Sequence, residues 1–229
     1  MSRTARLRYY RERVLDYLDE FGLPLRRRSL LFYRRQLDDQ SPASLVYGDG
    51  AIVQPVTVEE FRTLNWPGDP IITSEAATWE RSERRWPIVA RRFDTIEGFC
   101  WLEEGVAEIR FFDLHCPLPM RTLYLSRVWV YPDFRDLGIG RTLLESASAY
   151  ARQLGFEQLI SACVPHNVRM RHLFPKIGWT CYQRSRYLRV GRAVCFSIQP
   201  VGAGPVHLYS AREAAEKLTG CVRHETKLG

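Results

Sequence analysis

The segment from Leu125 to Gly140, LSRVWVYPDFRDLGIG, combines features that suit phosphate binding. Its apolar, β-branched start predicts a buried strand that ends at Val130, and Gly138-Ile139-Gly140 opens an amphipathic helix that stops at Gly155. The first N–H groups of a helix lack intrahelical partners, and the helix dipole adds about half a positive charge there. Glycine lets an anion approach the backbone closely, and Arg135 can add a charge-assisted hydrogen bond. These residues therefore predict a diphosphate site.

The spacing of this loop separates it from two other phosphate-binding motifs. No Gly-Lys-Ser/Thr follows the glycines, so the loop is not a Walker loop. The order Arg-x-x-Gly-x-Gly also differs from the dinucleotide fingerprint Gly-x-Gly-x-x-Gly. On these residues alone, an ordinary strand-to-helix turn is the alternative interpretation.

A second motif lies downstream and strengthens the first. Cys163-Val164 ends another apolar strand, after which Asn167, Phe174, Lys176 and Gly178-Trp179 follow at fixed offsets. The two motifs, in this order and at this distance, resemble the two signatures of the GNAT acyltransferase superfamily. The resemblance covers residues 51–199. It implies an α/β fold with a mixed, mostly antiparallel sheet and a central parallel strand pair flanked by helices.

This resemblance also implies an activity and a cofactor-binding surface. Acetyl-CoA or another acyl-CoA would donate its acyl group to an amine acceptor by direct attack in a ternary complex, with no metal ion. The residues whose positions match the coenzyme A contacts of the family are Val128, Trp129, Val130, Arg135, Asp136, Leu137, Gly138, Ile139, Gly140, Arg141 and Asn167. Asp136 and Leu137 replace a glycine and a basic residue that are common there.

The catalytic groups depart from the family pattern. Phe174 stands where a tyrosine usually protonates the leaving thiolate, and a phenyl ring cannot donate a proton. Tyr124 and Ser126 occupy the positions of the base in several family members, and we expect them to share a face with Val128 and Val130 unless a β-bulge intervenes. Neither is a good base at neutral pH, so they would order a water that relays the amine proton, unless Tyr124 is only a wall of the pocket. The sequence does not rank five further candidates: Glu97, Glu103, Glu104, His115 and Cys116.

Two other classes of function fit the same residues. The missing tyrosine would suit a non-catalytic acyl-CoA-binding module, and the basic run Arg26–Arg28 would suit an acyltransferase that uses an acidic carrier protein as donor. An interaction protein that acts through its N-terminal region is a third interpretation. The phosphate loop at residues 135–140 argues against it.

Composition and charge predict a cytoplasmic globular protein. The 229 residues carry a net charge of +7, with no apolar run of the roughly 18 residues that a membrane-spanning helix needs. The six cysteines form no Cys-x-x-Cys pair and five histidines form no ligand-spaced cluster, so we expect reduced thiols and no metal site.

The pattern predicts three regions. Residues 1–44 form a basic extension whose amphipathic helix, Thr4 to Phe21, packs on its own domain, on a second copy in a homodimer, or on an acidic partner. Residues 45–200 form the acyltransferase domain, and residues 201–229 form a helical extension.

Several elements can be predicted individually. Caps at Thr57, Ser74, Asn167 and Ser210 predict helices, of which the second spans Glu75 to Arg85 and the third ends or kinks at Phe174, before Pro175. His115 to Pro119 reads as a loop. The predicted strands cover residues 29–33, 51–58, 87–92, 96–102, 106–114, 121–130, 158–164, 179–189 and 192–198.

Overall fold

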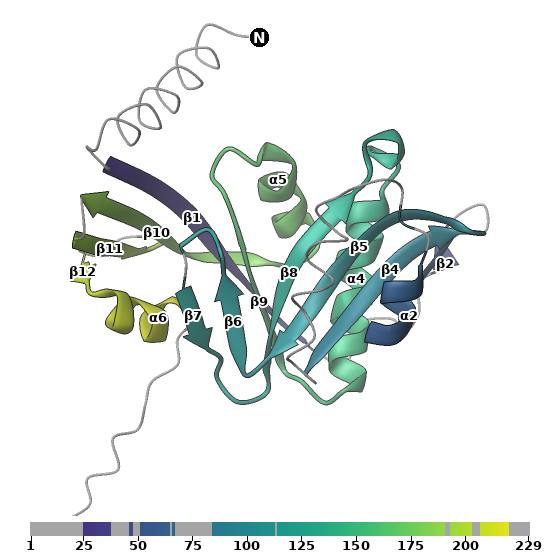
Figure 1. Ribbon diagram of the computed structural model, residues 1–229, viewed down its shortest axis with the longest axis horizontal. Coiled ribbons are helices and arrows are strands. Elements are labelled where there is room, and N and C mark those ends of the chain that lie inside the picture. Colours follow the sequence, from purple (N-terminus) through teal and green to yellow (C-terminus); the bar gives the residue numbers. More distant parts are fainter. Residues whose placement is uncertain are drawn as a thin grey trace, which may run out of the picture.

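The chain folds around one large, mixed sheet. The computed structural model describes residues 25–37, 46–47, 51–64, 66, 84–112, 114–190, 193–202 and 207–219. Within them, ten strands form a sheet in the order β12-β11-β10-β1-β9-β8-β5-β4-β3-β2, and β6 and β7 form a separate hairpin (Figure 1). Only β8 and β9 run parallel among the described pairs, which confirms the predicted mixed sheet with one central parallel pair.

The bounds of the elements are as follows. The strands are β1 (Leu25–Gln36), β2 (Val46–Tyr47), β3 (Ala51–Pro55), β4 (Arg85–Arg92), β5 (Thr95–Glu104), β6 (Val106–Ile109), β7 (Leu114–Pro117), β8 (Thr122–Val130), β9 (Gln158–Cys163), β10 (Thr180–Val190), β11 (Ala193–Pro200) and β12 (His207–Tyr209). The helices are α2 (Val58–Thr63), the 3-10 turn η1 (Pro132–Phe134), α4 (Ile139–Gln153), α5 (Val168–Lys176) and α6 (Ala211–Thr219).

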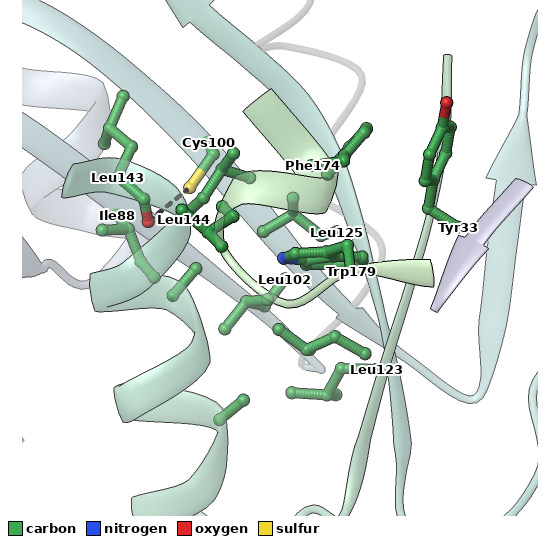
Figure 2. Packing of buried hydrophobic residues seen from close by; sticks show 14 of the residues in the cluster. Tyr33, Ile88, Cys100, Leu102, Leu123, Leu125, Leu143, Leu144, Phe174 and Trp179 are labelled. Atoms are coloured by element: carbon green, nitrogen blue, oxygen red, sulfur yellow. Dashed lines mark hydrogen bonds between the residues drawn. The ribbon is translucent and has the colours of Figure 1, made fainter. Parts of the chain in front are cut away.

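Apolar side chains cover both faces of the sheet. On one face, α4 and α5 pack through residues such as Leu143 and Phe174 onto Leu102 and Leu125 (Figure 2). On the other face, the β6-β7 hairpin and α6 pack onto β1 and β11, and α2 inserts Phe61 among the aromatic residues of β5. The sheet is therefore buried in the middle, where β8 and β9 lie.

The N-terminal strand lies inside the sheet. β1 pairs antiparallel with β9 on one edge and with β10 on the other. It begins at Leu25, so the basic run Arg26–Arg28 belongs to the strand rather than preceding it. Phe32 of this strand is fully buried, so the segment that precedes the two sequence motifs is part of the core.

The region between β5 and β8 folds differently from the prediction. Residues 106–114 do not form one strand, because the chain reverses at Arg110–Phe112, where the Phe112 amide donates to the Ile109 carbonyl (2.9 Å). The return strand β7 takes in His115–Pro117, which the sequence had suggested to be a loop. Apolar alternation continues through the turn, which is why the pattern alone did not reveal it.

The helix caps follow the sequence closely. Thr57 and Glu60 form the predicted capping box, and Ser210 and Glu213 exchange the equivalent bonds before α6. The expected helix at residues 4–21 lies outside the described residues. So does the expected helix at residues 75–85, except for Arg84 and Arg85. There Arg85 begins β4, so the second helix cannot extend that far.

Helix α5 continues past the predicted break. It runs to Lys176 with Pro175 inside its last turn. Proline removes one amide donor from the helix, but the turn is closed by the amides of Ile177 and Trp179, which both donate to the Phe174 carbonyl (3.2 and 2.9 Å).

The sheet opens where β8 and β9 separate. Their parallel pairing runs from Thr122 opposite Gln158 to Leu125 opposite Ser161 and stops there. The Ser161 hydroxyl donates to the Leu125 carbonyl (2.8 Å) at this last pair. Beyond it, β8 continues for five residues, 126–130, which pair with β5 on one edge and with no described strand on the other, so a gap separates β8 from β9.

A β-bulge changes the direction of the side chains at the same place. Ser126 pairs with Trp101 and Trp129 with Phe99, so two residues of β8 lie opposite one residue of β5. Arg127 adopts a φ of +53°. As a result Val128 and Val130 pack on the α4 side, whereas Tyr124 belongs to the opposite core. Residues 124, 126, 128 and 130 therefore do not share one face, because the bulge that the regular alternation excludes is present.

Candidate active site

A continuous groove follows the gap between β8 and β9. One part, which we call the loop lobe, has a volume of about 530 Å³ and lies between the 134–141 segment and α5. The other part, the strand lobe, has a volume of about 320 Å³ and reaches Tyr124 and Ser126. Val128, Asn167 and Met170 line both lobes, so the two parts join at the gap.

The start of α4 forms the floor of the loop lobe. Gly138 is the N-cap with a φ of +82°, a conformation that favours glycine. Its carbonyl accepts from the amides of Arg141 and Thr142 (2.9 and 3.2 Å), while the amides of Ile139 and Gly140 precede the first intrahelical bonds. These two donors and the helix dipole favour an anion here.

Gly140 keeps the groove open. A Cβ added there would lie 3.8 Å from a methyl group of Val130 and 3.8 Å from a methyl group of Leu173, both of which line the lobe. Any side chain at this position would therefore fill the space between the two walls. The glycine preserves a channel along the helix start.

Basic side chains surround the loop lobe. They are Arg135, Arg141, Arg169, His172 and Lys176, against the single lining carboxylate of Asp136. Arg135 is held in place, because it donates to the Val130 carbonyl (3.1 Å) and lies over the Trp129 ring, 5.5 Å from its centroid. Arg169 pairs with Asp136 (3.1 Å). The balance of charge favours a polyanionic ligand such as a phosphorylated nucleotide.

The structure brings most of the predicted coenzyme A residues together. Ten of them line the loop lobe: Val128, Trp129, Val130, Arg135, Asp136, Gly138, Ile139, Gly140, Arg141 and Asn167. The eleventh, Leu137, does not line it and is half exposed.

Residues of α5 also line the lobe, and sequence reasoning missed them. They are Arg169, His172 and Lys176, and only the helical spacing of three and four residues hinted that they share a face. Asn167 caps this helix, because its Oδ1 accepts from the Met170 amide (3.1 Å).

The strand lobe holds both predicted catalytic residues and a carboxylate behind them. Tyr124 and Ser126 line the lobe. Glu103 of β5 lies directly opposite Tyr124 in the strand register and accepts a 2.5 Å hydrogen bond from the Ser126 hydroxyl. Glu103 is only 2% exposed.

Tyr124 is held in its protonated form. Burial raises the pKa of its hydroxyl far above the ordinary range, and the negative charge of Glu103 raises that pKa further. Tyr124 therefore cannot be a base at neutral pH, although it can donate a hydrogen bond.

The structure ranks the other candidates that the sequence left open. Glu97 lies at the far end of β5 and pairs with Arg92 (2.9 Å), and Glu104 pairs with Arg84 (3.4 Å). His115 is exposed, and burial raises the pKa of the Cys116 thiol to about 12, so Cys116 remains a thiol. None of these four lines the strand lobe.

Phe174 is a core residue. It is fully buried between Tyr33 and Trp179, with ring centroids 4.5 and 5.0 Å away, and lines neither lobe (Figure 2). A tyrosine hydroxyl is thus absent from this position, and the ring itself faces the core.

Residues 58–179, which are 122 of the 229 residues, match the acetyltransferase (GNAT) family. The chain belongs to this family. No curated protein sequence matches it.

Several solved structures are similar to this chain at low sequence identity. A Drosophila protein is 15% identical with a TM-score of 0.50, and the alignment covers 80% of this chain and 58% of that one. A GNAT-family acetyltransferase from Novosphingobium aromaticivorans is 16% identical with a TM-score of 0.49, covering 73% and 66%. A GCN5-related N-acetyltransferase from Sphaerobacter thermophilus is 15% identical with a TM-score of 0.48, covering 84% and 57%. This GNAT chain thus spans less than two thirds of the length of each.

The described residues hold free cysteines but no candidate membrane-spanning helix or metal-ligand cluster. In the part of the chain that the structure describes, no helix is long and apolar enough to cross a membrane, and no three His, Cys, Asp or Glu side chains gather as metal ligands. The five cysteines in this part are free thiols, and Cys100, Cys116 and Cys163 are buried.

Proposed function

We propose that this protein is an acyl-CoA-dependent N-acetyltransferase, which moves an acetyl group from acetyl-CoA to an amine by direct attack in a ternary complex. The observation that carries the proposal is the continuous groove between β8 and β9. It joins an anion-binding helix start in the loop lobe to a lobe lined by Tyr124 and Ser126. A donor and an acceptor that enter from the two lobes would meet at Val128.

The residues of the loop lobe suit coenzyme A. The amides of Ile139 and Gly140, with Arg135 and Arg141, would hold its diphosphate, and the open channel at Gly140 admits it. Over residues 126–130, β8 does not pair with β9 in the described part of the chain, so backbone groups on this edge would be available to the pantetheine arm. Asn167 uses its Oδ1 as a helix cap, so its amide nitrogen is the group that would donate to the same arm.

The strand lobe would hold the acceptor. Its amine nitrogen attacks the thioester carbonyl, an N–C bond forms, the C–S bond breaks and the thiol is released. An acceptor that arrives as an ammonium ion loses two protons in all, of which one ends on the sulfur and one reaches solvent. Tyr124 would donate a hydrogen bond that orients the acceptor or a water beside it, because its hydroxyl remains protonated.

The free thiols fit a reducing compartment, so we place this activity in the cytoplasm. The homodimer and the acidic partner are proposed for the helix Thr4 to Phe21 of the 1–44 extension, which lies outside the described residues.

A screen of amine acceptors tests the proposed function. Purified protein is incubated with acetyl-CoA, or with longer acyl-CoAs, and a panel of small amines, amino sugars, peptides and protein N-termini. Products are detected by mass spectrometry of the acylated amine, because the protein's own thiols would react with a thiol reagent. We expect at least one amide product with acetyl-CoA. Tight binding of coenzyme A without transfer to any amine would instead indicate a non-catalytic binding module.

A further inference from the structure

The Glu103 carboxylate differs from Glu108, the neighbouring carboxylate of the strand lobe, in its ion pairs. Glu108 pairs with Arg85, Arg110 and Arg127 at 3.7, 3.1 and 3.5 Å. Glu103 is almost fully buried, yet among the described residues no cation lies within 4 Å of it. Its hydrogen-bond donors are the Ser126 hydroxyl at 2.5 Å and the Glu108 amide at 3.4 Å.

Such a carboxylate is unfavourable for folding. Removing a carboxylate from water is strongly unfavourable, and the hydrogen bonds that Glu103 accepts from one hydroxyl and one distant amide offset only part of this cost. A structural role would be served equally by a neutral amide of the same shape. The carboxylate is therefore better explained by chemistry at the surface that Ser126 presents to the groove.

We infer that Glu103 is the acceptor of the proton that the amine loses, and that it acts through Ser126. The inference rests on the proposed function. The ammonium N–H bond breaks and a new O–H bond forms on the Ser126 oxygen, while the original Ser126 O–H proton passes to a Glu103 oxygen. Glu103 becomes neutral, Ser126 is regenerated, and the amine acquires the lone pair that attacks the thioester. Glu103 later releases the proton to solvent through the same hydroxyl.

Ser126 lies between the groove and Glu103, where its hydroxyl can pass a proton from the amine to the carboxylate. Its side chain lines the lobe, whereas Glu103 does not. The bulge at Arg127 places Ser126 and Tyr124 toward Glu103 while turning Val128 to the other side of the sheet. The carboxylate thus reaches the acceptor only through the serine oxygen.

Charged and titratable groups from four strands face Glu103. Arg85 of β4 is its cross-strand neighbour and pairs with Glu108 of β6, which Arg127 of β8 also contacts. Tyr124 of β8 and Cys116 of β7 lie on the same side, and both stay protonated because burial raises their pKa values. Glu108 lines the strand lobe but pairs with three arginines, whereas Glu103 pairs with none of the described cations, so we assign the proton to Glu103.

The test uses isosteric variants of the full chain and the amine that gives the highest turnover in the acceptor panel. Glu103→Gln keeps the shape and removes the base. Glu104→Gln is the matched control, because Glu104 is the next residue of the same strand and its carboxylate pairs with Arg84 away from the groove. Ser126→Ala and the double variant Glu103→Gln/Ser126→Ala complete the series.

We expect Glu103→Gln to lower kcat/KM by about 10²-fold at pH 7, the lower end of what general base catalysis contributes. The thermal midpoint should be unchanged or higher, because a buried charge has been removed. Ser126→Ala should lower kcat/KM by a similar factor. The kcat/KM of the double variant should be no lower than that of either single variant, because the two groups act in series. Glu104→Gln should behave like the parent.

The pH profile separates this role from a structural one. The deficit of Glu103→Gln should shrink as the pH rises toward the pKa of the acceptor, because more acceptor arrives as free amine. It should also nearly vanish at pH 7 with methoxyamine, a weakly basic amine that is unprotonated there. A deficit of Glu103→Gln that is constant with pH and acceptor, or losses that multiply in the double variant, would overturn the inference. Parent-like turnover in Glu103→Gln would overturn it while leaving the proposed function intact, whereas a parent chain that acylates no amine would overturn both.

Discussion

Ser126 and Val128 are two residues apart on β8 but face opposite sides of the sheet. In a regular strand they would share a face, and the bulge at Arg127, with its φ of +53°, is the reason that they do not. Ser126 faces Glu103, whereas Val128 packs toward α4 beside the loop lobe. One bulge therefore directs consecutive parts of a single strand to the acceptor and to the donor.

The bulge can be tested with two variants at Arg127. Arg127→Asn and Arg127→Val both remove the ion pair with Glu108, but only a β-branched residue strongly resists a positive φ. We expect the Val variant to be less stable than the Asn variant by about 1–2 kcal/mol in urea unfolding. The apparent KM for acetyl-CoA should also be several-fold higher in the Val variant than in the Asn variant, because Ser126 and Val128 lose their relative orientation. Equal stability and equal KM values in the two variants would show that the backbone conformation is unimportant.

Tyr124 is expected to act as a hydrogen-bond donor rather than as a base. Tyr124→Phe should lower turnover about tenfold with unchanged affinity for coenzyme A. Because burial and Glu103 keep the hydroxyl protonated, this loss should be the same from pH 6.5 to 9.5. Turnover is measured across that range in parent and variant. If Tyr124→Phe matches the parent and Tyr124→Ala only raises the acceptor KM, Tyr124 is a wall of the pocket.

Phe174 is expected to matter for stability and not for chemistry. Phe174→Leu removes ring contacts with Tyr33 and Trp179 and should lower the free energy of unfolding by about 1–2 kcal/mol. Its kcat should remain within about tenfold of the parent, because the ring lines neither lobe. Chemical denaturation and steady-state kinetics measure the two quantities. A folded variant with a 10²-fold lower kcat would place the reaction elsewhere in the molecule.

Alkaline pH should destabilise the fold through Cys116. Burial raises the pKa of this thiol from 9.0 to about 12, so the folded state holds a proton that the unfolded chain releases above about pH 9. The contribution is fully present below pH 9 and is lost as the pH rises toward 12. The unfolding free energy of the parent should therefore fall more steeply than that of Cys116→Ala between pH 9 and 10.5, by up to about 1.4 kcal/mol per pH unit. Parallel slopes would show that the thiol titrates alike in both states.

Local signals in the sequence predicted much of this molecule. The capping pairs Thr57/Glu60 and Ser210/Glu213 act through neighbouring backbone groups, and the helix start at Gly138 depends on one left-handed residue. These features depend on few residues close in sequence, which is why their positions could be predicted. The residues predicted to contact coenzyme A are also mostly close in sequence, and ten of the eleven line the loop lobe.

Features that depend on tertiary pairing could not be predicted. The place of β1 between β9 and β10 is set by long-range strand pairing, and no local pattern encodes it. The bulge at Arg127 needs the register of β5 against β8, since an arginine in a strand gives no signal of a positive φ. Glu103 was only one of five candidates until its cross-strand position beside Ser126 distinguished it.

The most direct measurement is a calorimetric titration of coenzyme A into the parent, Gly138→Asp and Gly155→Asp. Both glycines have a positive φ, +82° and +84°, and lie at opposite ends of α4, so the two variants add the same strain and charge. Only Gly138→Asp places the carboxylate at the loop lobe. We predict that the parent and Gly155→Asp bind coenzyme A with similar affinity, and that Gly138→Asp binds at least about 10²-fold more weakly. Equal affinity in all three proteins would contradict the assignment of the groove as the coenzyme A site.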